Sequence, residues 1–192
     1  MQIQDSFFHR FKQPLEEMRF EAVSCNLCGS MSYKLLGSEY VFEIRECLSC
    51  GLVYISPQPC TEDLPQFYEG MFAADTACSY ESYNAKRAVM NHLRNIIARR
   101  SPPKSRLLEA GCGYGLFLQH IRDVASTLTG TEVSAPTAES ARKRNPHAHI
   151  VTGTLEAVDF PPESFDCIVL IAVFEHLKDP KAMLKKLQGW LA

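Results

Sequence analysis

The feature that most constrains the fold is a stretch in which an apolar strand, a glycine-rich turn and an apolar helix follow one another. It reads Leu107-Leu108-Glu109-Ala110-Gly111-Cys112-Gly113-Tyr114-Gly115-Leu116-Phe117-Leu118. Open α/β sheets bind ligands at the carboxyl ends of their strands, because glycines let the backbone come close and the next helix presents free N–H groups. The stretch therefore predicts an α/β fold with a ligand loop. A tight turn that binds nothing is the alternative.

The spacing of the glycines argues against a dinucleotide as the ligand. The dinucleotide pattern is G-x-G-x-x-G, whereas here the third glycine is Gly115, one place early, and Leu116 stands where glycine is needed. Glu109 lies two residues before the first glycine, where its carboxylate would repel a pyrophosphate and attract a cation. We therefore expect a cationic cofactor.

This loop resembles motif I, E/D-x-G-x-G-x-G, of the class I methyltransferases that use S-adenosylmethionine (SAM). The resemblance implies a Rossmann-like fold and a SAM site formed by this loop and the neighbouring strand ends. The cofactor contacts that it implies are Glu109, Gly111, Cys112, Gly113, Gly115, Glu132, Val133, Thr154, Leu155 and Ala172.

Two later strand ends contribute to this prediction. Glu132 ends a predicted strand at 127–133, near the expected place for a carboxylate that accepts both ribose hydroxyls. A solvated glutamate at a strand end is the alternative. A third predicted strand, 149–152, leads to Thr154, where methyltransferases of this type commonly have an aspartate for the adenine amino group. Thr154 departs from that pattern, so its hydroxyl or a neighbouring backbone group is expected to substitute.

The range 164–174, which contains the apolar run 167–174, predicts a fourth parallel strand, buried on both faces. It ends in Glu175-His176-Leu177, and the whole pattern resembles the fourth-strand motif of the same methyltransferases. His176 is the one histidine expected at a strand's carboxyl end beside the cofactor, which makes it the candidate general base. We favour a structural role, in which its ring caps the turn, over this catalytic one.

Two Cys-x-x-Cys-Gly knuckles precede the α/β half of the chain. Four thiolates at this spacing surround a tetrahedral zinc at about 2.3 Å, and no ligand position is left open, so the metal is expected to be structural. Predicted strands at 33–36 and 40–45, around a turn at Gly37-Ser38, complete a zinc-ribbon pattern. Reduced cysteines without a metal are the alternative; disulfides suit a secreted protein better. The expected zinc ligands are Cys25, Cys28, Cys47 and Cys50.

A Pro-x-Pro turn at Pro57 to Pro59 and a short predicted helix at 63–68 follow the knuckles. This order resembles the N-terminal zinc-binding region of bacterial methyltransferases that often act on sugars or cell-surface glycoconjugates. The resemblance implies methyl transfer from SAM to a small molecule, a sugar or glycoconjugate precursor. Tyr68, Tyr80 and Tyr83 either cover the cofactor with their rings or only pack the connector.

We expect four segments: an N-terminal arm at 1–20, a zinc-ribbon module at 21–60, a connector with the first helix at 61–105, and a Rossmann-like domain at 106–192. The connector helix is predicted over residues 86–100. Its apolar face is expected to consist of Val89, Leu93, Ile96 and Ile97.

The resemblance also raises a question about the end of the chain. The family usually continues through a Pro-Gly-Gly turn into three more strands, so the Rossmann-like fold is expected to be incomplete, with about four parallel strands. The fourth strand is then an exposed edge that favours self-association or a partner. The chain is expected to be a truncated methyltransferase, a non-catalytic zinc- and SAM-binding fragment or interaction module, or one part of a sheet that another chain completes.

Charge and hydropathy exclude two classes of partner. The net charge is −2, and the segment between the knuckles carries only Lys34 and Arg45 against three glutamates, so no nucleic-acid partner is expected. The longest apolar run has eight residues, far below the ~20 that span a bilayer, and the polar start is not a signal peptide. We expect a cytoplasmic protein whose partner is its small-molecule substrate. The methyl acceptor and the atom methylated are not identified by the sequence.

Overall fold

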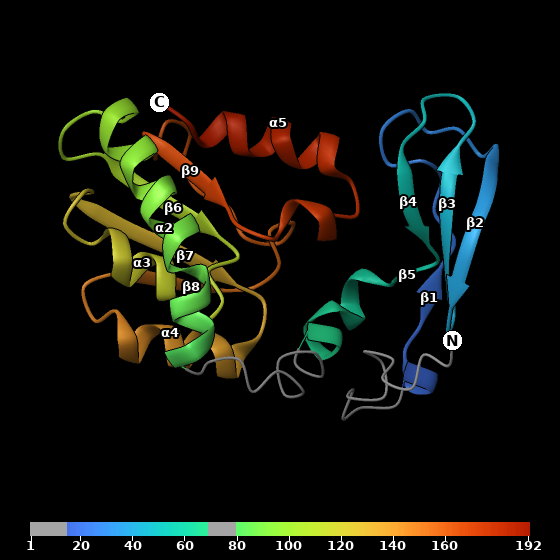
Figure 1. Cartoon of the computed structure of the whole chain (residues 1–192), viewed down its shortest axis with the longest axis horizontal. Coiled ribbons are helices and arrows are strands. Elements are labelled where there is room, and N and C mark those ends of the chain that lie inside the picture. Colours follow the sequence, from blue (N-terminus) through green and yellow to red (C-terminus); the bar gives the residue numbers. More distant parts are fainter. Residues whose placement is uncertain (1–14, 69–79) are drawn as a thin grey trace.

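The computed structural model describes residues 15–68 and 80–192 (Figure 1). A mostly β N-terminal module, residues 15–59, lies at one end, and an α/β domain lies at the other. Residues 64–68, which are helical, lie between them. No helix in the described ranges is long and apolar enough to cross a membrane.

The N-terminal module is built around a three-stranded antiparallel sheet. Its strands are β2 (Tyr33–Glu39), β3 (Phe42–Cys47) and β4 (Val53–Ser56), in the order β2-β3-β4. The predicted ribbon is confirmed, but the predicted turn at Gly37-Ser38 is wrong. Glu39 pairs with Phe42, so the chain reverses at residues 40 and 41, and Gly37 lies instead at a β-bulge. A glycine can serve a bulge as well as a turn, and the sequence pattern does not separate the two.

Residues before the first knuckle pack on the same module. A short 3-10 helix, η2 (Leu15–Glu17), buries Leu15, and Met18 is buried next to it. β1 (Phe20–Glu21) then pairs with β5 (Gln58–Pro59), which joins the start of the module to its end. The rest of the expected N-terminal arm, residues 1–14, lies outside the described residues.

The α/β domain contains a parallel sheet in the order β8-β7-β6-β9. The strands are β6 (Arg106–Ala110), β7 (Thr127–Glu132), β8 (His149–Thr152) and β9 (Cys167–Leu170). Every neighbouring pair is parallel. This arrangement confirms the predicted Rossmann-like fold of four strands, and it brings the carboxyl ends of all four to one edge.

Helices cover both faces of this sheet, because successive side chains of a strand point to opposite sides. One core contains Leu107 together with side chains of α2 (Tyr80–Arg100), α3 (Leu116–Ile121) and α4 (Ala135–Arg144). The other core contains Leu108 and the buried side of α5 (Pro180–Trp190). Leu107 and Leu108 are both completely buried, so the strand that carries the glycine loop is the centre of the domain.

Two sequence expectations for this domain are wrong. The connector helix begins at residue 80 rather than 86. Of its predicted apolar face, Leu93 and Ile97 pack into the core as expected, whereas Val89 and Ile96 are 58% and 39% exposed. Met90, which the prediction omitted, is buried, because contact with α3 rather than the densest apolar spacing decides the buried face.

The fourth strand, β9, is shorter than the predicted range of 164–174, and its residues are half-buried rather than fully buried. Among the described strands it has a full neighbour, β6, on one side only. On the other side, a single parallel bridge joins Phe165 to Leu191, where the chain returns after α5. Beyond Leu170 the backbone leaves the strand, since Ala172 has a φ of 53° and the 3-10 turn η4 (Phe174–His176) follows.

An ion pair fastens β9 to β6 and supports a testable prediction. The Asp166 carboxylate accepts hydrogen bonds from the Arg106 guanidinium at 2.8 Å and from the Arg106 backbone N–H at 2.7 Å. These bonds lower the pKa of Asp166 from its ordinary 3.8 to about 2. A carboxylate with a depressed pKa stabilises the fold above its ordinary pKa, and that stability is lost as the pH falls toward the folded-state pKa.

We therefore expect Asp166→Asn to lower the melting temperature at pH 7 by a few degrees, and the difference from the native chain to shrink between pH 4 and pH 2. Thermal melts followed by circular dichroism at several pH values measure this. Asp123→Asn, which breaks the exposed Arg94–Asp123 pair, is the control, and we expect it to change little. A difference for Asp166→Asn that is constant from pH 7 to pH 2 would contradict the assignment.

Candidate functional site

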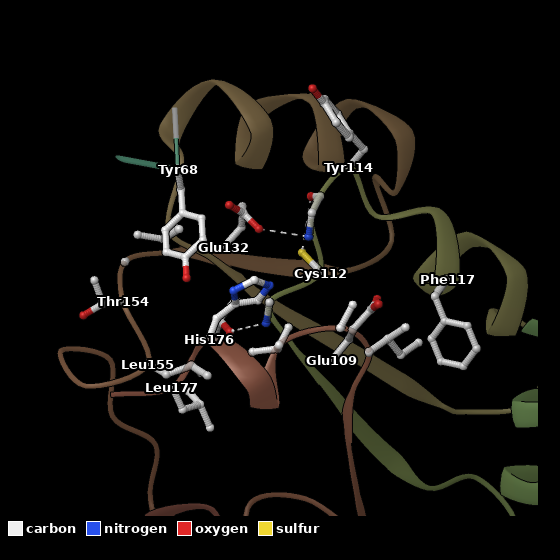
Figure 2. A pocket seen from close by; sticks show the side chains of 18 of the residues that line it. Tyr68, Glu109, Cys112, Tyr114, Phe117, Glu132, Thr154, Leu155, His176 and Leu177 are labelled. Carbon is white, nitrogen blue, oxygen red and sulfur yellow. Dashed lines mark hydrogen bonds between the residues drawn. The ribbon is translucent and has the colours of Figure 1, made fainter. Parts of the chain in front are cut away.

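A cavity of about 380 Å³ opens at the carboxyl ends of the parallel strands (Figure 2). It is lined by the glycine loop after β6, by the ends of β7 and β8, by the segment after β9, and by the helical residues 64–68 of the connector. Nine of the ten predicted cofactor contacts line it, and so does His176. The nine are Glu109, Gly111, Cys112, Gly113, Glu132, Val133, Thr154, Leu155 and Ala172.

Gly115 is the predicted contact that does not line the cavity. It precedes α3 with a φ of 70°, and a Cβ placed on it would lie 2.3 Å from Nδ2 of Asn145. That nitrogen donates a hydrogen bond to the Gly115 carbonyl. Gly115 therefore shapes the start of the helix rather than the surface of the cavity. Gly111 does line the cavity, and a Cβ there would lie 2.5 Å from Val173, so the loop can pass the fourth-strand segment only as glycine.

Glu132 is held in a fixed orientation at the end of β7. Its Oε2 accepts a hydrogen bond from the Gly113 backbone N–H at 2.9 Å, and its Oε1 accepts one from the Ser134 N–H at 2.9 Å. The residue is 3% exposed, so the alternative of a solvated glutamate is wrong. Burial raises the pKa of Glu132, although the backbone N–H donors oppose this shift. Each carboxylate oxygen keeps lone-pair capacity for a donor from a ligand.

Glu109 is also 3% exposed, and its Oε2 has no hydrogen-bond partner. Burial raises the pKa of Glu109 well above its ordinary value, and the nearby charge of Glu132 adds to that effect. A buried carboxyl oxygen without a partner is costly unless a donor or a cation reaches it. The residues of this cavity therefore fit a ligand that carries a positive charge and hydroxyl donors.

Tyr68 and His176 face each other at the cavity (Figure 2), with ring centroids 6.0 Å apart and planes at 88°. Burial, with Glu156, Glu132 and Glu175, raises the pKa of Tyr68 to about 12, so the phenol stays neutral at physiological pH. The interpretation that Tyr68 covers the ligand site agrees with its place; the side chains of Tyr80 and Tyr83 lie outside the described part.

The turn that carries His176 is closed by backbone groups rather than by the imidazole. The His176 N–H donates to the Val173 carbonyl at 2.9 Å, and the Leu177 N–H donates to the Phe174 carbonyl at 3.2 Å. The ring itself lies at the cavity, facing Tyr68 (Figure 2). This geometry leaves the imidazole available to a ligand, which is the requirement for a base.

Sequence reasoning missed the residue that fixes the loop after β8. The ammonium of Lys186, on α5, donates to three backbone carbonyls, those of Leu155, Glu156 and Val158, at 3.1, 2.9 and 2.6 Å. It also lies 5.3 Å from the centre of the Trp190 ring. A lysine on a helix normally indicates a solvated surface, so the pattern gave no signal for this contact.

The four knuckle cysteines come together in the N-terminal module. Their sulfur atoms all lie within 4.8 Å of one another, and the Cys25–Cys50 and Cys28–Cys47 pairs are 3.5 Å apart. A tetrahedral zinc with bonds of about 2.3 Å places its sulfurs about 3.8 Å apart, so the cluster fits this ion. Each knuckle is closed by a glycine with a φ of 75°, Gly29 or Gly51, as the sequence predicts.

Electrostatics in this cluster also favour a bound cation. Burial raises the pKa of the Cys47 thiol, but the backbone N–H groups of Ser49 and Cys50 and the neighbouring thiols outweigh it and lower this pKa to about 6. The backbone N–H of Leu52 lowers the pKa of Cys50, but burial and the other three sulfurs outweigh it and raise this pKa to about 12. Four thiolates cannot ionise side by side without a compensating charge, and a divalent metal supplies it.

One sequence family matches the part of the chain that forms most of the cavity. Residues 108–192 match the sequence model described as a methyltransferase domain. The match covers less than half of the chain, and the matched region is called the methyltransferase domain below. The methyltransferase domain includes the glycine loop, Glu132, Thr154 and the segment that carries His176.

Curated relatives match parts of the chain. It is 38% identical over 63 residues to the dTDP-3-amino-3,6-dideoxy-alpha-D-glucopyranose N,N-dimethyltransferase of Streptomyces fradiae, covering 33% of this chain and 25% of that protein. It is 38% identical over 73 residues to a probable S-adenosylmethionine-dependent methyltransferase of Mycolicibacterium smegmatis, covering 38% of this chain and 28% of the relative. The matches thus span about a quarter of the length of these two relatives.

A solved structure supports the fold. The SAM-bound amino pentose methyltransferase of calicheamicin biosynthesis from Micromonospora echinaspora superposes with a TM-score of 0.52 at 22% identity. The superposition covers 59% of this chain and 51% of that one. At this level of identity the comparison shows a shared Rossmann-like fold.

Proposed function

We propose that this protein is a SAM-dependent methyltransferase whose acceptor is a small molecule, a sugar or a glycoconjugate precursor. One observation carries the proposal: the methyltransferase domain holds two buried carboxyls, Glu109 and Glu132, at a single cavity beside its glycine loop. Such a cavity suits a ligand that combines a positive charge with a ribose.

In this proposal each residue of the cavity has a limited task. SAM supplies an electrophilic methyl group on its sulfonium, so the protein mainly binds, orients and removes a proton. Glu132 accepts the ribose hydroxyls, and the orphaned oxygen of Glu109 faces the charged methionine part. Thr154 and Leu155 contact the adenine, and Tyr68 covers the cavity.

His176 remains the candidate base for an acceptor hydroxyl or amine. Its imidazole lies at the cavity and does not close the turn on which it sits. A base must reach the proton that it removes, and in this place His176 can do so for an acceptor bound between it and Tyr68. Full turnover by His176→Ala would exclude this role.

The choice of a sugar acceptor rests on similarity. The Streptomyces fradiae relative acts on a dTDP-linked amino sugar, and the order of two cysteine knuckles, a Pro-x-Pro turn and a tyrosine-containing helix resembles methyltransferases of sugars and glycoconjugates. We further propose that the cysteine cluster binds a structural zinc. A cytoplasmic location and the absence of a nucleic-acid partner remain predictions.

Two measurements test the proposed function. Isothermal titration calorimetry of the zinc-loaded chain with SAM and with S-adenosylhomocysteine (SAH) is expected to show binding, and no heat from folded protein would rule out the cofactor. Transfer of a labelled methyl group to a panel of nucleotide sugars then tests the acceptor class.

Binding without transfer would favour a second function, that of a zinc- and SAM-binding interaction module. The exposed apolar side chains of the N-terminal module favour this candidate. Leu27 and Leu48, in the two knuckles, are 54% and 66% exposed, and Met31 is 72% exposed. Exposed apolar groups gathered on one small module are typical of interaction surfaces.

A further inference from the structure

Two polar contacts join the N-terminal module to the wall of the cavity. Nδ2 of Asn26, the residue after Cys25, donates a hydrogen bond to the Lys178 carbonyl at 2.6 Å. The Lys178 ammonium forms an ion pair with Glu21, on β1 of the same module. Lys178 directly follows His176 and Leu177, which both line the cavity. The module therefore holds the chain at the residue where the cavity wall ends.

The wall segment from Ala172 to Leu177 is a short turn that begins in an unfavourable backbone conformation. Ala172 has a φ of 53°, a conformation that costs a non-glycine residue energy, and the 3-10 turn after it spans three residues. At the carboxyl end of the wall segment, Asp179 caps α5 by accepting a hydrogen bond from the Ala182 N–H at 2.9 Å. The Asn26 bond acts one residue before that cap, so it sets how the turn enters the helix.

The buried amide oxygen of Asn26 shows that this contact is not confined to the surface. Its Oδ1 is buried and has no hydrogen-bond partner, which is a cost that the bond through Nδ2 must offset. The equivalent position of the second knuckle is Leu48, which is 66% exposed. Although the two knuckles share one backbone design, the first one carries a half-buried polar side chain and meets the methyltransferase domain.

We propose that Asn26 is a positioning residue: the first knuckle, in the shape that four-cysteine coordination gives it, holds the Lys178 carbonyl and thereby places His176 and Leu177 at the cavity. The effect of this placement on cofactor binding rests on the proposed function. The positioning of the turn by Asn26 does not depend on that function. A change in the cysteine cluster is then transmitted to the cavity through the Asn26–Lys178 bond, which lies beside the Lys178–Glu21 ion pair.

Hydrogen exchange measured by mass spectrometry tests the link directly. The backbone amides of His176 and Leu177 are bonded within the turn, so their exchange reports its opening. In Asn26→Ala we expect these two amides to exchange about tenfold faster, while the amides of α4 exchange as before. The affinity for SAH, measured by calorimetry, is expected to fall severalfold.

Leu48→Ala is the matched control, because it alters the same position of the other knuckle and leaves the Lys178 contact intact. Asn26→Asp is the second variant; it keeps the size of the side chain but replaces the donor by an acceptor, so it is expected to behave like Asn26→Ala. Zinc content is measured for every variant. The result is read from whichever of the two Asn26 variants retains the metal content of the native chain.

Unchanged exchange at His176 and Leu177 in a zinc-loaded Asn26 variant would overturn the proposal. So would faster exchange of equal size in Leu48→Ala, because the effect would then belong to the module as a whole. Failure of the native chain to bind SAH would refute the proposed function, and the exchange data would still decide the role of Asn26.

Discussion

Glu132→Ala is expected to weaken SAH binding by about 100-fold or more, which is the largest effect of any single change in the cavity. Hydrogen bonds to a charged group contribute about 1.5–3 kcal/mol each, and in the proposed function Glu132 accepts two from the ribose. The variant also removes the acceptor for the Gly113 N–H, so the glycine loop loses a hydrogen bond that holds it in place. Calorimetry with SAH measures the change.

Glu132→Gln and Glu139→Ala complete this experiment. The glutamine keeps the shape but places an N–H₂ group against the backbone donors of Gly113 or Ser134, so we expect an intermediate loss. Glu139 lies on α4 with its side chain 54% exposed, and its replacement is expected to leave the affinity unchanged. Native affinity in a folded Glu132→Ala protein would remove Glu132 from the cofactor site.

The pH dependence of binding gives a further check on Glu132. Burial raises its pKa in the free protein, and hydroxyl donors prefer the charged carboxylate. Affinity is therefore expected to be full above that raised pKa and to decline as the pH falls through it, beginning above the ordinary value of 4.5. In Glu132→Gln this part of the pH dependence should be absent.

Removal of zinc is expected to unfold the N-terminal module while the methyltransferase domain stays folded. The buried cluster around the knuckles consists of Cys25, Cys47 and Tyr54, so two of its three members are themselves proposed zinc ligands. A structural zinc contributes about 10–16 kcal/mol of binding energy, and a core this small cannot replace it. The two cores of the domain share no residue with this cluster.

Hydrogen exchange before and after chelation measures this effect. We expect the amides of β2, β3 and β4 to lose protection, and those of β6 and β7 to keep it. Cys47→Ser should reproduce the result without a chelator, and Cys167→Ser, which alters a cysteine outside the cluster, should not. Full protection of the three strands in metal-free protein would show that zinc does not hold the module together.

Sequence reasoning found those parts of the site that are defined by short motifs. The glycine loop, Glu132 at its strand end and the cysteine knuckles are each defined by spacing within a few residues, and the structure places them as expected. The fold followed from the same signals, since alternating strands and helices leave few topologies open to a parallel sheet.

The parts that it missed depend on contacts between distant segments. Lys186 reaches carbonyls about thirty residues away, and Asn26 reaches one 152 residues away. The predictions for the buried face of α2 and for the length of β9 failed in part for a related reason. The neighbouring helix decides the first and the strand's position in the sheet decides the second, and apolar spacing alone contains no information on either.

The contact between Lys186 on α5 and the loop after β8 has a mechanical consequence. The Lys186 ammonium donates to the carbonyls of residues 155, 156 and 158 and so ties α5 to the loop after β8 at the cavity. Helix α5 begins at Pro180, two positions beyond Lys178, whose carbonyl accepts the hydrogen bond from Asn26. A small tilt of α5 would therefore change both walls of the cavity at once.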